Sequence, residues 1–222
     1  MDILQAMQER HSVRAYTDRS IEKEKTDILF KEIESINAQS GLSLQLILDD
    51  KDAFNSMMAH YGKFVNVTNY IAVVGKKSED FDTKAGYYGE KLVLLAQTLG
   101  LNTCWVALTY NKKKNKIRLN DGQRLACVIA LGYGQTQGVQ HKIKTYEQVV
   151  KNPSPSDAQW FKQGVHAALL APTAMNQQKF KFELDGNKVK LRKGWGFYTK
   201  LDLGIVKYHF EAAAGTDNFT WQ

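Results

Sequence analysis

A strongly apolar stretch at 87–99 constrains the fold of this chain more than any other feature, because it predicts a helix with few polar faces. The run from Leu92 to Leu95 is entirely apolar, so its side chains point in almost every direction around the helix axis. Neighbouring elements must cover such a helix, and we expect Gly100 to end it. The chain has 222 residues, 43% hydrophobic and 24% charged, which is typical of a globular protein that buries roughly 70% of its unfolded surface.

Hydrophobic periodicity predicts further helices and strands on either side of this segment. One helix begins after an N-cap at Ser20, repeats apolar residues at helical spacing and stops at Gly41. The tripeptide Asp185-Gly186-Asn187 predicts the turn of a β-hairpin. The other predicted elements are helices at 3–7, 158–170 and 203–214, and strands at 42–48, 70–74, 103–108, 127–131, 180–184 and 189–192.

The proline-rich segment 153–157 marks the clearest boundary in the chain, because prolines end the preceding element and Ser156 or Asp157 can cap the next helix. We therefore divide the chain into a first part, 1–152, and a shorter second part, 153–222. Each part runs in the order helix, strand, strand, buried helix, and a glycine lies on either side of each buried helix. These glycines are Gly89 and Gly100 in the first part, and Gly204 and Gly215 in the second. We interpret the pattern as a degenerate internal duplication, with coincidence among apolar helices as the alternative.

The charge balance indicates an anionic partner, because 30 Lys and Arg against 23 Asp and Glu give +7, which suits a nucleic acid or a phosphorylated small molecule. The basic run 111–116 has no interleaved aromatic residues to stack on bases, so we interpret it as a solvated loop and expect no nucleic-acid partner. The glycines at 132–138 have the wrong spacing for a dinucleotide-binding loop. Cys104 and Cys127 lie in apolar runs, as buried thiols do, and the five histidines lack the pairing of a zinc site, so we expect no metal.

The chain also lacks the usual signals for membranes and export. No run of about 18 apolar residues could cross a bilayer. The N-terminus does not have the basic start and apolar run of a signal peptide. We therefore expect no membrane partner and a cytoplasmic location.

Three segments carry side chains suited to binding a ligand. The first places two guanidinium groups, an imidazole and a hydroxyl within five residues, and arginine matches phosphate oxygens in a bidentate manner; a solvated helix end is the alternative. The second is a pair of lysines that would point to the same side of an extended chain. The third follows a helix-ending proline and could bind a planar polar ligand, with a plain helix-to-strand turn as the alternative. Their members are Arg10, His11, Ser12 and Arg14; Lys142 and Lys144; and Pro172, Thr173, Ala174, Asn176 and Gln177.

Five stretches together resemble motifs of the FMN-dependent nitroreductase family. They are Arg-His-Ser-Val-Arg-Ala-Tyr at 10–16, the helix and Gly-Leu-Asn-Thr-Cys-Trp stretch at 89–105, Ile-Ala-Leu-Gly-Tyr at 129–133, the basic segment 142–150 and Ala-Pro-Thr-Ala-Met-Asn-Gln at 171–177. The resemblance implies an α+β fold with a central, mostly antiparallel sheet packed by helices. It also implies an enzyme that uses FMN to take hydride from NADH or NADPH at flavin N5 and passes it to a quinone, nitroaromatic or similar small-molecule acceptor.

The same resemblance implies roles for the candidate residues. The flavin phosphate would be bound by the motif around His11 and by the two lysines, that is by Arg10, Ser12, Arg14, Lys142 and Lys144. The ribityl chain or ring would lie near Pro172, Thr173, Ala174, Asn176 and Gln177. The backbone around Ala107 would face N5, and no side chain is expected to act as an obligate catalytic acid or base.

The position of the asparagine motif departs from the family pattern. In the family this motif comes early and FMN lies at a homodimer interface, whereas the equivalent segment here, 35–41, has no proline. The duplication would explain the displacement, so we predict a single-chain pseudo-dimer with one FMN per chain, which is compatible with further oligomerisation. Lys179, Phe180 and Leu108 replace the usual Pro, Trp and Gly, and they keep open the alternative of a flavin-binding sensor or carrier without turnover.

Overall fold

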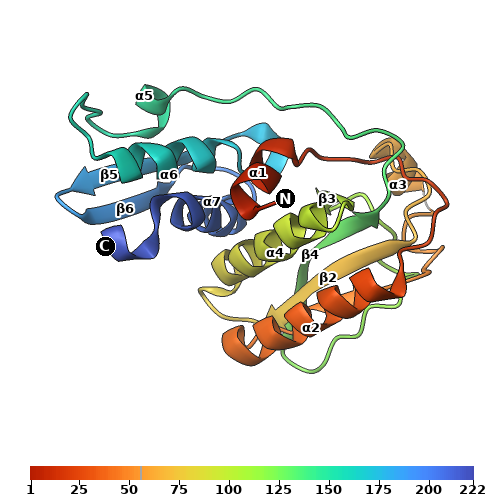
Figure 1. Ribbon diagram of the computed structural model, residues 1–222. Coiled ribbons are helices and arrows are strands. Elements are labelled where there is room, and N and C mark those ends of the chain that lie inside the picture. Colours follow the sequence, from red (N-terminus) through yellow and green to blue (C-terminus); the bar gives the residue numbers. More distant parts are fainter. Residues whose placement is uncertain (56) are drawn as a thin grey trace. The chain divides into compact units, whose positions relative to one another are not determined.

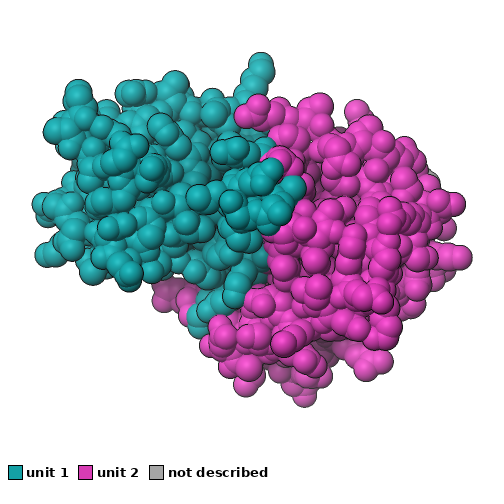
Figure 2. All heavy atoms as spheres, viewed as in Figure 1, with its two compact units in different colours: residues 1–8, 82–91, 141–222 teal, residues 9–81, 92–140 magenta. Residues whose placement is uncertain are grey.

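The computed structural model describes residues 1–55 and 57–222, apart from the side chains of Met58 and His60, so the expectation for His60 lies outside the described residues. The chain forms two compact units, which are drawn in Figure 1 and coloured separately in Figure 2. Unit 1 contains Met1–Gln8, Asp82–Lys91 and His141–Gln222, and unit 2 contains Glu9–Phe81 and Leu92–Gln140. None of the helices in the described part of the chain is long and apolar enough to cross a membrane.

Unit 2 is built on a four-stranded antiparallel sheet with the strand order β1-β2-β4-β3 (Figure 1). The two central strands are apolar, and the side chains of 71–74 and 128–130 have no exposed surface. The elements are β1 (Gln45–Ile47), β2 (Asn69–Lys76), β3 (Asn102–Val106), β4 (Gln123–Gly132), α2 (Lys23–Ser40) and α3 (Met57–Tyr61). This sheet, packed by helices, confirms the predicted α+β class.

Two strands of this sheet are shorter than the sequence predicts. The strand predicted at 42–48 is confined to Gln45–Ile47, with Leu42 in an isolated bridge to Gly75. Between these two pairings β2 carries a bulge at Val73 and Val74, and a bulge increases the local twist and disturbs regular pairing. Strand β3 ends at Val106 rather than at 108, because the chain bends from 107 to 110.

Helix α2 confirms the predicted apolar repeat but not the predicted cap. Leu29, Ile33 and Ile36 are buried on one face, and Gly41 ends the helix in a left-handed conformation with φ 71°. The helix begins after Glu22 rather than Ser20, and Glu22 makes no capping hydrogen bond. An acidic side chain is nonetheless favourable at this end, because the helix dipole places partial positive charge there.

Unit 1 packs helices against a three-stranded sheet with the order β5-β6-β7. The predicted hairpin is confirmed, with its turn at Gly186 in a left-handed conformation (φ 60°). Strand β7 pairs parallel to β6 and was not predicted, since two residues carry no periodicity. The elements are α1 (Ile3–Glu9), α5 (Tyr146–Val149), α6 (Gln159–Leu169), β5 (Phe180–Asp185), β6 (Lys188–Lys193), α7 (Thr199–Ala214), β7 (Thr220–Trp221) and the 3₁₀ turns Ala174–Asn176 and Thr216–Asn218.

The cap predicted for α6 is wrong. Its N-cap is Ala158, which has no side chain that could cap the helix. The carboxylate of Asp157 instead accepts hydrogen bonds from the Ser154 amide (3.0 Å) and the Tyr146 hydroxyl (2.7 Å). These bonds tie the proline-rich segment to α5 rather than to the helix that follows.

Helix α4 (Phe81–Thr98) contacts α7 so closely that two glycines are required at the crossing. A Cβ atom on Gly204 would lie 2.0 Å from the Thr83 carbonyl oxygen, and one on Gly86 would lie 2.0 Å from the Leu201 carbonyl oxygen. Both helices begin earlier than predicted, at Phe81 and Thr199. Glycine weakens a helical pattern when it is read from sequence alone, and here packing overrides that preference.

The two compact units divide the chain differently from the predicted parts. Unit 1 contains residues on both sides of the 152/153 boundary and also takes in Met1–Gln8 and Asp82–Lys91. The internal duplication therefore stays a prediction.

Candidate functional site

The segment around Arg10–Tyr16 in unit 2 is held in an extended conformation by backbone hydrogen bonds on both sides. The Val13 amide donates to the Thr103 carbonyl (3.0 Å), which ties the segment to β3. On the other side, the Tyr16 amide donates to the Val65 carbonyl and the Val65 amide to the Arg14 carbonyl, both at 3.0 Å. Since the segment is anchored on both sides, its side chains have fixed directions.

Some side chains of this segment anchor it in the core, and others are presented to solvent. Val13 and Tyr16 are buried in the core of unit 2, whereas Ser12 and Arg14 are exposed. Arg10 is 3% exposed. The structure thus brings the predicted phosphate residues of this motif together within unit 2, with Ser12 and Arg14 accessible from solvent.

Cys104 lies under this motif and remains a thiol. Burial raises its pKa, and the neighbouring Arg14 guanidinium and the hydrogen bond with the Ser12 hydroxyl only partly oppose this effect. Cys104 and Cys127 are both buried thiols, as predicted. The Ser12–Cys104 contact helps to orient the serine.

A glycine-rich loop at 132–138 lies against the same motif. A Cβ atom on Gly138 would lie 2.8 Å from the His11 Cβ atom and 3.1 Å from the Ser12 carbonyl oxygen, so only glycine permits this approach. Buried Asn102 orients the loop, since its Oδ1 accepts from the Gly134 amide (2.9 Å) and its Nδ2 donates to Gln137 Oε1 (2.9 Å). The sequence pattern gave no indication of this use of the glycines.

The surroundings of His11 favour its uncharged form. Burial and the adjacent Arg10 charge lower the pKa of His11. Its Nδ1 atom is buried and has no hydrogen-bond partner among the residues that the structure describes. Ala107 is half-buried and follows directly after β3 in the same unit.

The loop after Pro172 in unit 1 has an unusual backbone. Met175, Asn176 and Gln178 adopt left-handed conformations with φ of 53°, 52° and 45°, which non-glycine residues rarely do. Backbone strain of this kind persists only where surrounding contacts hold it, and it is often found at functional sites.

Gln178 is one of the residues that hold the loop. Its Nε2 donates to the Lys142 carbonyl and to Asn176 Oδ1, both at 2.8 Å, and its Oε1 accepts from the Lys144 amide at 2.9 Å. Its backbone amide donates to Thr173 Oγ1 at 3.0 Å. Sequence analysis did not select Gln178, although its position directly after the asparagine motif would have justified doing so.

The two predicted lysines lie beside this loop. The Lys142 carbonyl accepts from Asn176 Nδ2 (2.8 Å), and Lys144 Nζ donates to the Gln178 carbonyl (2.7 Å) and the Gln177 carbonyl (3.3 Å). Burial, with the charges of neighbouring lysines, lowers the pKa of Lys144. Unit 1 therefore brings Lys142 and Lys144 together with the residues from Pro172 to Gln177.

Asp202 in the first turn of α7 contacts the same loop from another direction. Its Oδ1 accepts from the Ala174 amide (2.9 Å) and its Oδ2 from Gln177 Nε2 (2.7 Å). Burial raises the pKa of Asp202 to about 6, against the opposing effect of these two bonds. Sequence analysis missed this residue, because nothing local indicates a contact with residues 25 and more positions away.

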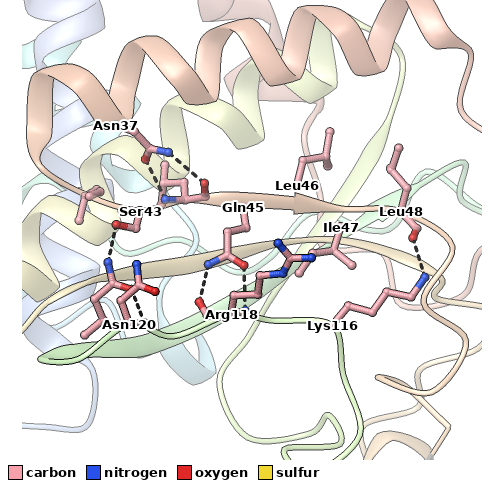
Figure 3. A pocket seen from close by; sticks show the side chains of 12 residues that line it. Asn37, Ser43, Gln45, Leu46, Ile47, Leu48, Lys116, Arg118 and Asn120 are labelled. Atoms are coloured by element: carbon pink, nitrogen blue, oxygen red, sulfur yellow. Dashed lines mark hydrogen bonds between the residues drawn. The ribbon is translucent and has the colours of Figure 1, made fainter.

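A separate pocket of about 780 Å³ lies beside β1 in unit 2 (Figure 3). The side-chain amide of Gln45 bonds to the backbone of Arg118 there, at 2.7 and 3.0 Å, and Lys116 Nζ donates to the Asp49 carbonyl at 2.9 Å. None of the predicted site residues lines this pocket. Within residues 1–55 and 57–222, no group of three or more His, Cys, Asp or Glu residues could hold a metal ion.

The comparison with known families decides the identity of the chain. Residues 2–214 match the family model described as "Putative TM nitroreductase". The chain belongs to this nitroreductase family. No curated protein matches it significantly.

Solved structures of nitroreductases share the fold. One described as a "putative nitroreductase" from Thermotoga maritima MSB8 has a TM-score of 0.72 at 22% identity. The match covers 96% of this chain and 83% of the Thermotoga chain. One from Desulfovibrio desulfuricans, "in complex with FMN", has a TM-score of 0.55 at 22% identity and covers 70% and 99%. A "Putative NADH dehydrogenase/NAD(P)H nitroreductase" from Parabacteroides distasonis has a TM-score of 0.53 at 24% identity and covers 68% and 98%.

Proposed function

We propose that this member of the nitroreductase family is an FMN-dependent oxidoreductase that takes hydride from NADH or NADPH and passes it to a quinone, nitroaromatic or similar small-molecule acceptor. The observation that carries the proposal is the anchored motif of unit 2, which presents Ser12 and Arg14 to solvent. The loop at 132–138 lies close to this motif because Gly138 has no side chain. The Desulfovibrio relative was solved in complex with FMN, and the name of the Parabacteroides relative includes NAD(P)H.

The residues of this motif fit a flavin phosphate chemically. Guanidinium groups and a hydroxyl donate hydrogen bonds to phosphate oxygens, and charge-assisted bonds of this type are the stronger ones. We propose that Arg10, Ser12 and Arg14 hold the phosphate, and that Lys142 and Lys144 contribute positive charge. Neutral His11 can take part as a hydrogen-bonding group without adding charge.

The chain's own contribution to turnover is binding and orientation. FMN, when bound, supplies hydride transfer at N5. The side-chain amide of Asn176 has one hydrogen left to donate, and the side-chain oxygen of Gln177 can accept, so both can serve the polar edge of a planar ring or its ribityl chain. The half-buried backbone at Ala107 would limit access of water on its side of the ring. We propose one FMN per chain, bound without the need for a second chain.

The experiment is a spectrum followed by reduction. The full chain is purified and freed of flavin, and FMN is then added back. The Kd for FMN is measured by flavin fluorescence for wild type and for Arg14→Ala. Arg118→Ala is the control for loss of an exposed arginine in the same unit. Anaerobic NADH or NADPH should bleach the bound flavin, and a quinone or nitroaromatic should restore its colour. A protein that does not bind FMN refutes the proposal. Bound flavin that neither nucleotide reduces favours a sensor or carrier instead.

A further inference from the structure

We propose that Asp202 is a positioning residue for the cofactor site: its carboxylate holds the loop from Ala174 to Gln177 in the conformation that presents Asn176 and Gln177 to the ligand. The inference rests on the proposed function for its consequence, but the positioning itself concerns only contacts within unit 1.

The carboxylate contacts the loop at two points. Its two oxygens accept separately from the Ala174 backbone amide at 2.9 Å and from Gln177 Nε2 at 2.7 Å. The second hydrogen of Gln177 Nε2 points to the Phe197 carbonyl at 2.7 Å. The amide of Gln177 is therefore fixed by two acceptors, and it cannot turn without losing one of them.

The loop needs this anchor because its backbone is held away from its preferred conformations. Three of the four residues from Met175 to Gln178 are left-handed, and such residues relax unless contacts hold them. Gln178 and Lys144 hold the C-terminal end of the loop. Asp202 holds its N-terminal end, at Ala174, and the side chain between the two ends, Gln177.

An ionised carboxylate suits these contacts better than a protonated one. Both contacts at the carboxylate come from N–H donors, and such bonds are stronger when the acceptor is charged, so a proton on either oxygen weakens them. Asp202 is 5% exposed, and burial raises its pKa to about 6. Titration of the anchor thus falls within the range in which flavin binding can be measured.

The charged groups on the neighbouring segments are mostly lysines, with one carboxylate on α4. Lys144 Nζ bonds to the carbonyls of Gln177 and Gln178, and Lys179 lies beside Gly196, where a Cβ atom would be 3.1 Å from its Nζ. Lys200 is exposed on α7, where its carbonyl accepts from Thr83 Oγ1 of α4. Asp82 and Lys84 lie on the same turn of α4.

The first test measures FMN affinity against pH. Kd is determined between pH 5 and 8 for wild type, Asp202→Asn and the exposed control Asp217→Asn. We expect Asp202→Asn to weaken binding about tenfold at pH 8, as loss of one hydrogen bond to a charged group does. We expect the ratio of the two Kd values to approach one at pH 5. The ratio removes the titration of the FMN phosphate itself, which also occurs near pH 6. A ratio that does not change with pH overturns the proposal.

The second test needs no flavin. Hydrogen exchange of the Ala174 amide should be at least about tenfold faster in Asp202→Ala than in wild type and unchanged in Asp217→Asn. In wild type its protection, corrected for intrinsic exchange, should fall between pH 7 and 5. Unchanged protection in both comparisons overturns the positioning role. If the exchange results hold but neither wild type nor variant binds FMN, the proposed function is wrong while the positioning of the loop stands.

Discussion

Replacing His209 by leucine should destabilise the protein, because it breaks a buried pair between α7 and α4. His209 on α7 and Glu90 on α4 are both fully buried. The His209 Nδ1 atom lies 3.0 Å from the Ala167 carbonyl and Nε2 lies 2.9 Å from Glu90 Oε1. A carbonyl can only accept, so Nδ1 carries a hydrogen. The Nε2–Oε1 contact therefore contains one shared proton, and the pair is neutral as a whole wherever that proton resides.

Without His209 the Glu90 carboxyl loses its bond to the imidazole inside the core. Removing one partner of a buried pair costs about 3–5 kcal/mol. We therefore expect the free energy of unfolding of His209→Leu to lie about 3–5 kcal/mol below that of wild type.

Urea unfolding measures this difference. The exposed His166→Leu on α6 controls for loss of a histidine from the surface of unit 1. Glu90→Gln should lose less than about 1.5 kcal/mol, because its amide can donate to Nε2 of a neutral imidazole. Glu90→Leu/His209→Leu should recover part of the loss. A loss below about 1 kcal/mol for His209→Leu, or no recovery in the double variant, would refute the reasoning.

The remaining predictions concern packing, cofactor binding and pH. Gly204→Ala places Cβ 2.0 Å from a backbone oxygen, so we expect a loss of about 3 kcal/mol or more in thermal or urea unfolding, while the exposed Ala212→Ser on the same helix costs less than about 1 kcal/mol. Arg14→Ala should weaken FMN binding by about 1.5–3 kcal/mol; an unchanged Kd contradicts the phosphate assignment. Because the folded-state pKa of Asp202 is raised from 3.8 to about 6, its contribution to stability is complete below pH 4 and lost as the pH rises through 6. The free energy of unfolding of wild type should therefore fall by roughly 2–3 kcal/mol relative to that of Asp202→Asn between pH 4 and 6. Parallel pH profiles of the two proteins would contradict this prediction. Flavin absorbance combined with light scattering should give one FMN per chain at every oligomeric state, and loss of FMN on dilution to monomer would exclude this stoichiometry.

Local patterns were enough to predict most elements. The Asp-Gly turn at 185–186 defined the hairpin, and Gly41 and Gly215 marked two helix ends, because these signals act within a few residues. The beginning of α4 was missed because its first turns, 81–86, combine polar residues with a glycine. That glycine is explained only by the Leu201 carbonyl across the crossing, and such a tertiary contact leaves no local pattern.

The candidate site was predictable to a similar extent. The motif at 10–16 was recognisable because its residues act together within one segment. Gln178 and Asp202 were not, because each acts on backbone groups supplied by distant segments, such as the Lys142 carbonyl and the Ala174 amide. Residues that position a loop contribute geometry rather than a motif, and only the fold reveals what they contact.

Helix α7 carries two buried titratable groups, and their surroundings compensate charge to different extents. His209 is paired with Glu90, so the pair is neutral and its integrity supports the fold. Asp202 bonds to two neutral amides, and its charge is therefore less well compensated, as its raised pKa indicates. Removing the first compensation should destabilise the chain. Removing the second charge should abolish the loss of stability between pH 4 and 6 and, at pH 8, weaken FMN binding through the loop at 174–177. An Asp202→Asn protein that lacks this pH-dependent loss of stability and binds flavin more weakly would separate the two roles, since a residue needed only for folding cannot produce that combination.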